Sequence, residues 1–164
     1  MGDRPRIKRA RGGQIVVRMA PEERALLGDL PGQLRELLDE RGDDPSIQRL
    51  FPPAYRNHPD HDREYQRLMA DDLRDRHAAS LAVLAGTAGA EELSEEEAAA
   101  WLSALNNLRL VLGTRLDVSE DMDEDLDPAD PRAPGLALYG YLSLLTQQLV
   151  DVLAGALPPP VWRT

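Results

Sequence analysis

One segment of the sequence places carboxylates at a spacing that could bind a cation. Aspartates stand at every second position from Asp121 to Asp127, which is how a calcium-binding EF-hand loop begins. That loop also requires glycine at its sixth position and glutamate at its twelfth. Here those positions hold Leu126 and Arg132, so the calcium motif fails. We therefore interpret residues 119–134 as a solvated acidic loop.

The three histidines do not complete a metal site. His58 and His61 lie three residues apart in a proline-containing connector rather than on a helix face, and His77 is distant in sequence. No cysteine is present, which excludes disulfides, thiol catalysis and thiolate metal ligands. We expect no metal and no cofactor.

The sequence contains no recognisable catalytic motif. Neither a nucleophile elbow nor a glycine-rich phosphate loop is present. Carboxylates are so frequent that pairs at acid–base spacing arise by chance. We predict that the protein is not an enzyme, and keep an enzyme of unrecognised type as the third interpretation.

Arg109 interrupts the apolar stripe of a predicted helix. It stands four residues after Leu105 and three before Leu112, where an unpaired guanidinium would be costly to bury. Asp72 lies on the apolar side of the preceding long helix. We predict a buried ion pair between Arg109 and Asp72 that sets the helix register, with a ligand site at Arg109 as the alternative.

The N-terminal segment is basic, although the chain as a whole has a net charge of −10. Residues 1–18 contain six basic side chains and one acidic one. We expect this segment to contact a protein partner or a nucleic acid, and a solvated edge strand whose charges discourage pairing is an equally good interpretation. The candidate contact residues are Arg6, Lys8, Arg9, Arg11 and Arg18.

The elements that position these residues are predominantly helical. Leucine recurs at helical spacing from Leu26 to Leu38, and Ser94 with Glu97 forms a capping box before a helix over 95–116. We predict a mainly α protein, a single domain over residues 1–164. A basic β-hairpin spans 1–19 around a Gly-Gly turn, and a bundle of four to five helices spans 21–157. Pro31 predicts a kink or two abutting helices.

The longest uncharged segment lies near the C-terminus. Residues 133–150 contain proline, glycine and glutamine, which makes a buried helix a better interpretation than a membrane span. The charged N-terminus lacks the apolar core of a signal peptide. We therefore expect a cytoplasmic protein that does not contact a membrane. A homodimer, formed through the last helix or the hairpin, is an open alternative to a monomer.

Four segments resemble one actinobacterial family, long known as a domain of unknown function and named for the oxidative-stress regulator AosR. The resemblance covers nearly the whole chain. Its most specific part is Asn-x-Leu-Arg-Leu-x-Leu-Gly, which ends at Gly113. The segments are 101–116, Arg6–Arg9 with the Gly-Gly pair, Leu50–Tyr55 and Tyr139–Leu142.

This resemblance implies a regulator linked to stress-responsive transcription, without enzymatic activity. Thiol-based regulation is excluded for this sequence, because a disulfide switch cannot operate in a chain without cysteine. We expect a non-enzymatic regulator that binds protein, with a component of the transcription machinery as the partner. Direct DNA binding through the hairpin is the alternative, disfavoured because no predicted helix has the basic face of a recognition helix.

Overall fold

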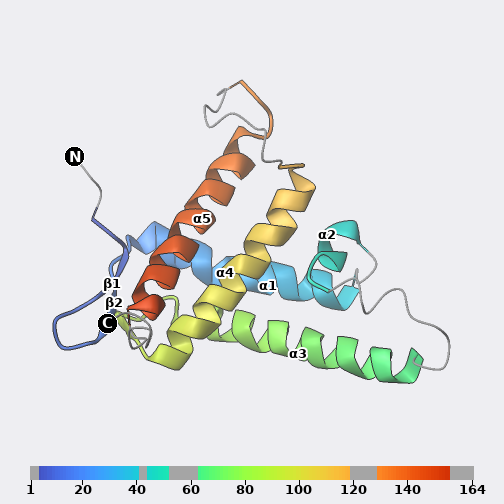
Figure 1. The fold of residues 1–164 in the computed structure, drawn as a ribbon. Helices are drawn as coiled ribbons and strands as arrows, with labels where there is room; N and C mark the ends of the chain where they lie inside the picture. Colours follow the sequence, from blue (N-terminus) through green and yellow to red (C-terminus); the bar gives the residue numbers. More distant parts are fainter. Residues whose placement is uncertain (1–3, 41–43, 52–62, 119–128, 156–164) are drawn as a thin grey trace, which may run out of the picture.

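The computed structural model describes residues 4–40, 44–51, 63–118 and 129–155 (Figure 1). It confirms a mainly α fold with an N-terminal hairpin. The elements in chain order are β1 Ile7–Arg9, β2 Ile15–Val17, α1 Pro21–Glu40, α2 Pro45–Gln48, α3 Arg63–Thr87, β3 Glu92–Leu93, α4 Glu95–Arg115 and α5 Ala133–Ala154. His58 and His61 lie outside the described residues, as does most of the acidic loop, residues 119–128.

The hairpin turns at Gly13, whose φ of 92° is a conformation that glycine adopts without strain. β1 and β2 pair antiparallel, with Ile7 opposite Val17. The structure adds a strand that the sequence did not predict, because β3 pairs with β2 and places Leu93 opposite Ile15. A strand of two residues is too short to show a sequence pattern.

Helix α5 packs against β1. The side-chain carbonyl of Gln148 accepts hydrogen bonds from the backbone amides of Arg6 at 2.9 Å and Ile7 at 3.0 Å. These bonds fix β1 to α5.

Local signals define the helix boundaries. The capping box of α4 is confirmed: the Glu97 amide donates to Ser94 Oγ at 3.0 Å, and the Ser94 amide donates to Glu97 Oε1 at 2.8 Å. Helix α1 continues through Pro31 as one helix instead of dividing into two, and Pro31 is buried.

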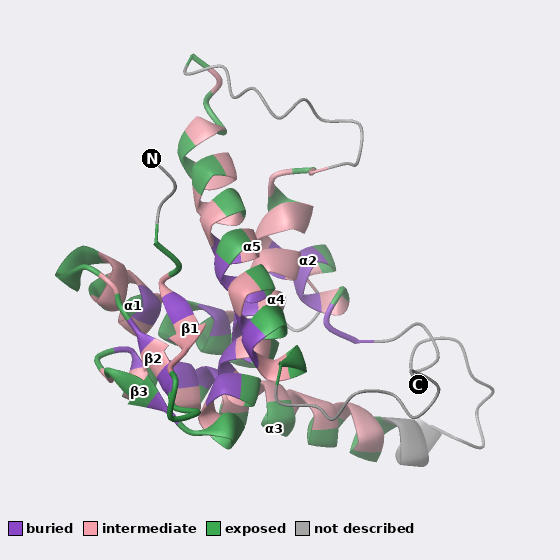
Figure 2. Cartoon of the chain, turned by 60° about the vertical axis from the view of Figure 1, so that its left-hand side comes forward, coloured by how far each residue is buried: buried purple, intermediate pink, exposed green. Residues whose placement is uncertain are grey.

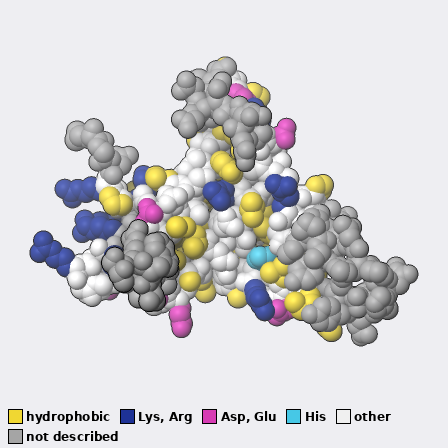
Figure 3. All heavy atoms as spheres, viewed as in Figure 1, with side chains coloured by type: hydrophobic (Ala, Val, Ile, Leu, Met, Phe, Trp, Pro, Cys, Tyr) yellow, Lys and Arg dark blue, Asp and Glu magenta, His cyan; other side chains and the backbone are white. Residues whose placement is uncertain are grey.

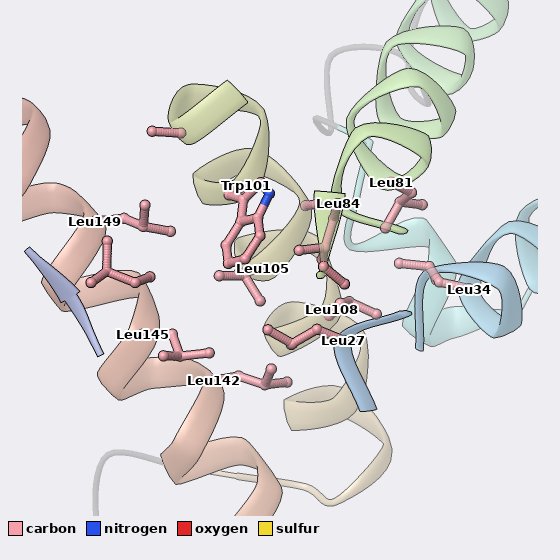
Figure 4. Packing of buried hydrophobic residues seen from close by; sticks show 14 of the residues in the cluster. Leu27, Leu34, Leu81, Leu84, Trp101, Leu105, Leu108, Leu142, Leu145 and Leu149 are labelled. Carbon is pink, nitrogen blue, oxygen red and sulfur yellow. The ribbon is translucent and has the colours of Figure 1, made fainter. Parts of the chain in front are cut away.

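Helix α4 is the centre of the core, as its apolar character on several sides predicts (Figure 4). It packs between α5 on one side and α3 on the other, and α1 packs against α3 (Figure 1). Trp101 is fully buried, and its Nε1 donates to Thr87 Oγ1 at 2.6 Å. Figure 2 shows that α1, α4, α5 and the hairpin each contribute buried residues. The large, fully buried side chains of this core include Leu27, Leu81, Leu84, Trp101, Leu105, Leu142, Leu145 and Leu149.

One polar contact crosses from α3 to α4 near the edge of the core. His77 Nε2 lies 3.1 Å from the Leu50 carbonyl oxygen, and Asn107 Nδ2 lies 2.9 Å from His77 Nδ1. A carbonyl can only accept, so the Nε2 carries the proton and the Nδ1 accepts from Asn107. Burial lowers the pKa of His77 below its ordinary value of 6.5, against the opposing effect of the Leu50 carbonyl.

Helix α5 is, by length and composition, apolar enough to span a membrane, a test that core helices of water-soluble proteins also pass. In this fold its inner face is part of the core, with Leu142, Leu145 and Leu149 fully buried.

Candidate functional site

Two of the five candidate contact residues are bound within the molecule. Arg6 donates from its Nε to the Glu23 carboxylate of α1, and its guanidinium lies 5.4 Å from the centre of the Tyr141 ring of α5. Arg9 donates to Glu95 Oε1 at 2.7 Å and to the Val152 carbonyl at 3.0 Å. These two arginines therefore attach the hairpin to α1, α4 and α5.

The contacts around Glu23 shift the pKa values of the acidic groups in this cluster. Burial by itself would raise the pKa of Glu23, but hydrogen bonds from the Ala20 amide and from Arg6 outweigh it, so the pKa lies below its ordinary value. Burial raises the pKa of Tyr141, and the neighbouring Glu23 carboxylate raises it further. The cluster thus holds an ionised carboxylate beside a neutral phenol.

The other basic residues of the hairpin are exposed or partly exposed. Arg4, Arg11 and Arg18 are exposed, and Lys8 lies on the strand face opposite the buried Ile7. Among the described residues, none of the four forms an ion pair within the protein. Figure 3 shows basic side chains projecting from the side of the molecule where the hairpin lies. We call Arg4, Lys8, Arg11 and Arg18 the basic surface.

The predicted ion pair between Arg109 and Asp72 is wrong. The Asp72 side chain is 51% exposed and pairs with Arg76 at 2.8 Å, one helical turn along α3. Arg109 instead donates to Asn106 Oδ1 at 3.0 Å on its own helix. An exposed carboxylate can pair with an arginine four residues away on the same helix without losing its hydration, whereas a buried pair incurs the cost of desolvation. Asp72 therefore pairs with Arg76.

Two structural features were not recognised in the sequence. Arg24 donates to four backbone carbonyls at the junction of the sheet and α1, including Ala90 at 2.7 Å. Arg109 and Arg49 line one cavity although they are 60 positions apart. The position of Arg109 in an apolar stripe was the only sequence signal for this cavity. Within the described residues, no group of histidine and carboxylate side chains could hold a metal ion.

Comparisons with known proteins agree with the resemblance seen in the sequence. The family model of a domain of unknown function, DUF2017, matches residues 4–153. Proteins named oxidative stress regulator AosR in Mycobacterium bovis and Mycobacterium tuberculosis are each 28% identical over 199 residues, covering 92% of this chain and 87% of the relative. A relative in Mycobacterium leprae is 28% identical and covers 90% of the chain. No solved structure matches.

Proposed function

We propose that this chain, which belongs to the DUF2017 family, is a non-enzymatic regulator that binds an acidic face of a protein partner through the basic surface. The relatives named as oxidative stress regulators support a regulatory role. The observation that carries the proposal is that the basic side chains of the hairpin fall into two groups, one that forms ion pairs with described residues and one that does not. Arg6 and Arg9 form ion pairs that attach the hairpin to the helices. Arg11 and Arg18, in contrast, are exposed and make no ion pair within the described residues.

Charge complementarity favours protein over DNA as the partner. The body that carries the basic surface belongs to a chain of net charge −10, which repels a polyanion at long range. An acidic patch on a protein carries far fewer charges than DNA, so the same body repels it less, and charge complementarity at the contact fixes the orientation of the partner. We further propose that the partner belongs to the stress-responsive transcription machinery and that the protein acts in the cytoplasm.

Site-specific crosslinking in cells of the source organism tests the proposal. A photo-crosslinking residue replaces Arg11, and a control places it at Glu36, an exposed position on α1. We expect one discrete protein adduct from position 11 and none from position 36. The adduct is identified by mass spectrometry, with and without peroxide treatment of the cells.

Charge reversal then tests whether the adduct depends on the basic surface itself or only on the net charge of the protein. Arg11→Glu combined with Arg18→Glu should abolish the adduct, whereas Arg35→Glu, a reversal at an exposed position of α1, should leave it unchanged. Fluorescence anisotropy with a duplex DNA provides the competing outcome. Binding of DNA that weakens steeply with salt and is lost in the double reversal would replace the protein partner with DNA.

A further inference from the structure

A cavity of about 230 Å³ lies where α2, α4 and α5 meet, away from the basic surface. Arg49 follows α2, Arg109 and Gly113 belong to α4, and Tyr139 belongs to the second turn of α5. In Figure 1 the C-terminal part of α4 and the N-terminal part of α5 run side by side, with α2 beside α4. Ligand pockets are commonly about 300–1,000 Å³, so an occupant of this cavity must be small.

Arg109 is partly buried but has no carboxylate partner among the described residues. The half-buried arginines Arg6, Arg9 and Arg74 each pair with a carboxylate. Arg24 pairs with no carboxylate among the described residues but donates to four carbonyls. Among the described residues Arg109 has a single hydrogen bond, to an amide oxygen, and no ion pair. Its Nε is buried without a partner, as are those of Arg9 and Arg74, but those two arginines have a carboxylate to neutralise them. A partly desolvated guanidinium without a counterion is costly, and a bound anion would remove that cost.

Arg49 brings a second guanidinium to the same cavity. It is exposed and forms no ion pair with a described residue. Gly113 permits the close approach of the opposite wall, because a Cβ at this position would stand 3.0 Å from Cε2 of Tyr139. A glycine inside a helix is unfavourable by about 1 kcal/mol relative to alanine, so its presence is accounted for by the room it leaves for the Tyr139 ring.

Two further side chains of the cavity, Thr114 and Asp117, can accept hydrogen bonds. Thr114 gives its hydroxyl proton to the Leu110 carbonyl at 2.9 Å, which leaves its oxygen as an acceptor. The carboxylate-bearing Asp117 also lines the cavity and has a φ of 55°, a left-handed conformation at the end of α4. It makes no ion pair with Arg49 or Arg109, although all three line one space. The cavity therefore offers two cations and two acceptors.

We propose that this cavity binds a small oxyanion that retains a hydroxyl group, of the phosphate type. Arg49 and Arg109 neutralise the anion, and the acceptors Thr114 and Asp117 receive its O–H. Charge alone does not distinguish phosphate from sulfate, but sulfate carries no proton near neutral pH, so a carboxylate in the site repels it. The site is independent of the basic surface and of its partner.

Isothermal titration of the full chain with inorganic phosphate, and separately with sulfate at equal ionic strength, tests the proposal. We expect saturable phosphate binding that is at least several-fold tighter than sulfate binding. Arg49→Ala and Arg109→Met should each weaken phosphate binding by about tenfold, the effect of one charge-assisted hydrogen bond. Arg35→Ala, an exposed arginine outside the cavity, should have no effect.

Asp117→Asn is the most specific variant, because asparagine also tolerates the left-handed conformation. It should tighten sulfate binding and abolish the preference for phosphate. The proposal is overturned by the absence of saturable binding up to about 10 mM phosphate, by equal affinities for both anions in the wild type, or by unchanged binding in Arg49→Ala. If Arg109→Met does not fold, Arg49→Ala and Asp117→Asn decide the question. The variant Arg11→Glu with Arg18→Glu should bind phosphate normally, so failure of one proposal leaves the other standing.

Discussion

The contact between His77 and Asn107 should make the protein less stable as the pH falls below 6.5. A single substitution at Asn107 should reverse this contribution, so that stability increases as the pH falls. In the wild type the imidazole is held neutral, because its Nδ1 accepts from the Asn107 amide and burial lowers its pKa. The unfolded chain therefore takes up a proton on this histidine at higher pH than the folded chain does. This contribution to stability is complete above the ordinary pKa of 6.5 and is lost as the pH falls below it.

Asn107→Asp converts the donor into a carboxylate, which favours the protonated imidazole. Both ring nitrogens then donate, one to the introduced carboxylate and one to the Leu50 carbonyl. An opposite charge at this distance raises a pKa by about 1–3 units, and one unit corresponds to about 1.4 kcal/mol. Because His77 is only half-buried, we expect about 1–2 kcal/mol of stability gained between pH 8 and pH 5.5, relative to the wild-type trend.

Urea unfolding at a series of pH values measures this difference, and Asn107→Leu is the control. The leucine variant removes the donor without adding charge, and should lose about 1–3 kcal/mol at pH 8 because the imidazole Nδ1 is left without a partner. NMR titration of the imidazole should show the pKa of His77 above 6.5 in Asn107→Asp and below it in the wild type. A parallel fall in stability on acidification in both proteins would refute the assigned contact.

Three further predictions concern single contacts. Ser94→Ala removes the side-chain acceptor that caps α4 and should cost about 1 kcal/mol in the free energy of unfolding, measured by urea. Trp101→Phe leaves Thr87 without its indole donor and opens space in the core, so it should lower stability by about 2–4 kcal/mol in the same assay. Glu23→Gln should flatten the acid unfolding curve, because the wild-type carboxylate has a lowered pKa and its contribution is lost as the pH falls below 4.5.

Each of these has a matched comparison. Ser94→Thr should retain most of the cap, so equal losses for alanine and threonine would contradict the capping contact. Thr87→Val should account for the hydrogen-bond part of the Trp101→Phe effect, and a neutral result there would contradict that bond. Glu22→Gln changes an exposed carboxylate on the same turn of α1 as Glu23, and an equal flattening of the acid curve by both variants would show that the Arg6 contact is not the cause.

The helices could be predicted from the sequence because their signals are local. The spacing of leucines and the capping box at Ser94 lie within single helices, and the structure reproduces both. The hairpin followed from its Gly-Gly turn and β-branched strand. β3 could not be predicted, because two residues carry no periodicity.

The side-chain contacts were less predictable because they depend on how helices rotate against one another. Leucine periodicity places Arg109 and Asp72 on their own helices but does not give the angle between α3 and α4, so the expected pair was wrong. The same reasoning could not separate the anchoring arginines from the available ones. Arg9 finds its carboxylate 86 positions away, and no local pattern records such a distance.

The attachment of Arg6 and Ile7 to Gln148 has a consequence for how the chain is made. These bonds span 142 and 141 positions, so β1 cannot make them until α5 has been synthesised. At the usual translation rate of about 5–20 residues per second, the ribosome needs roughly 7–28 s to produce the intervening chain. During that interval the emerging N-terminal segment lacks its final neighbour. The hydrogen bonds between β1 and α5 therefore form only after residue 148 has been synthesised.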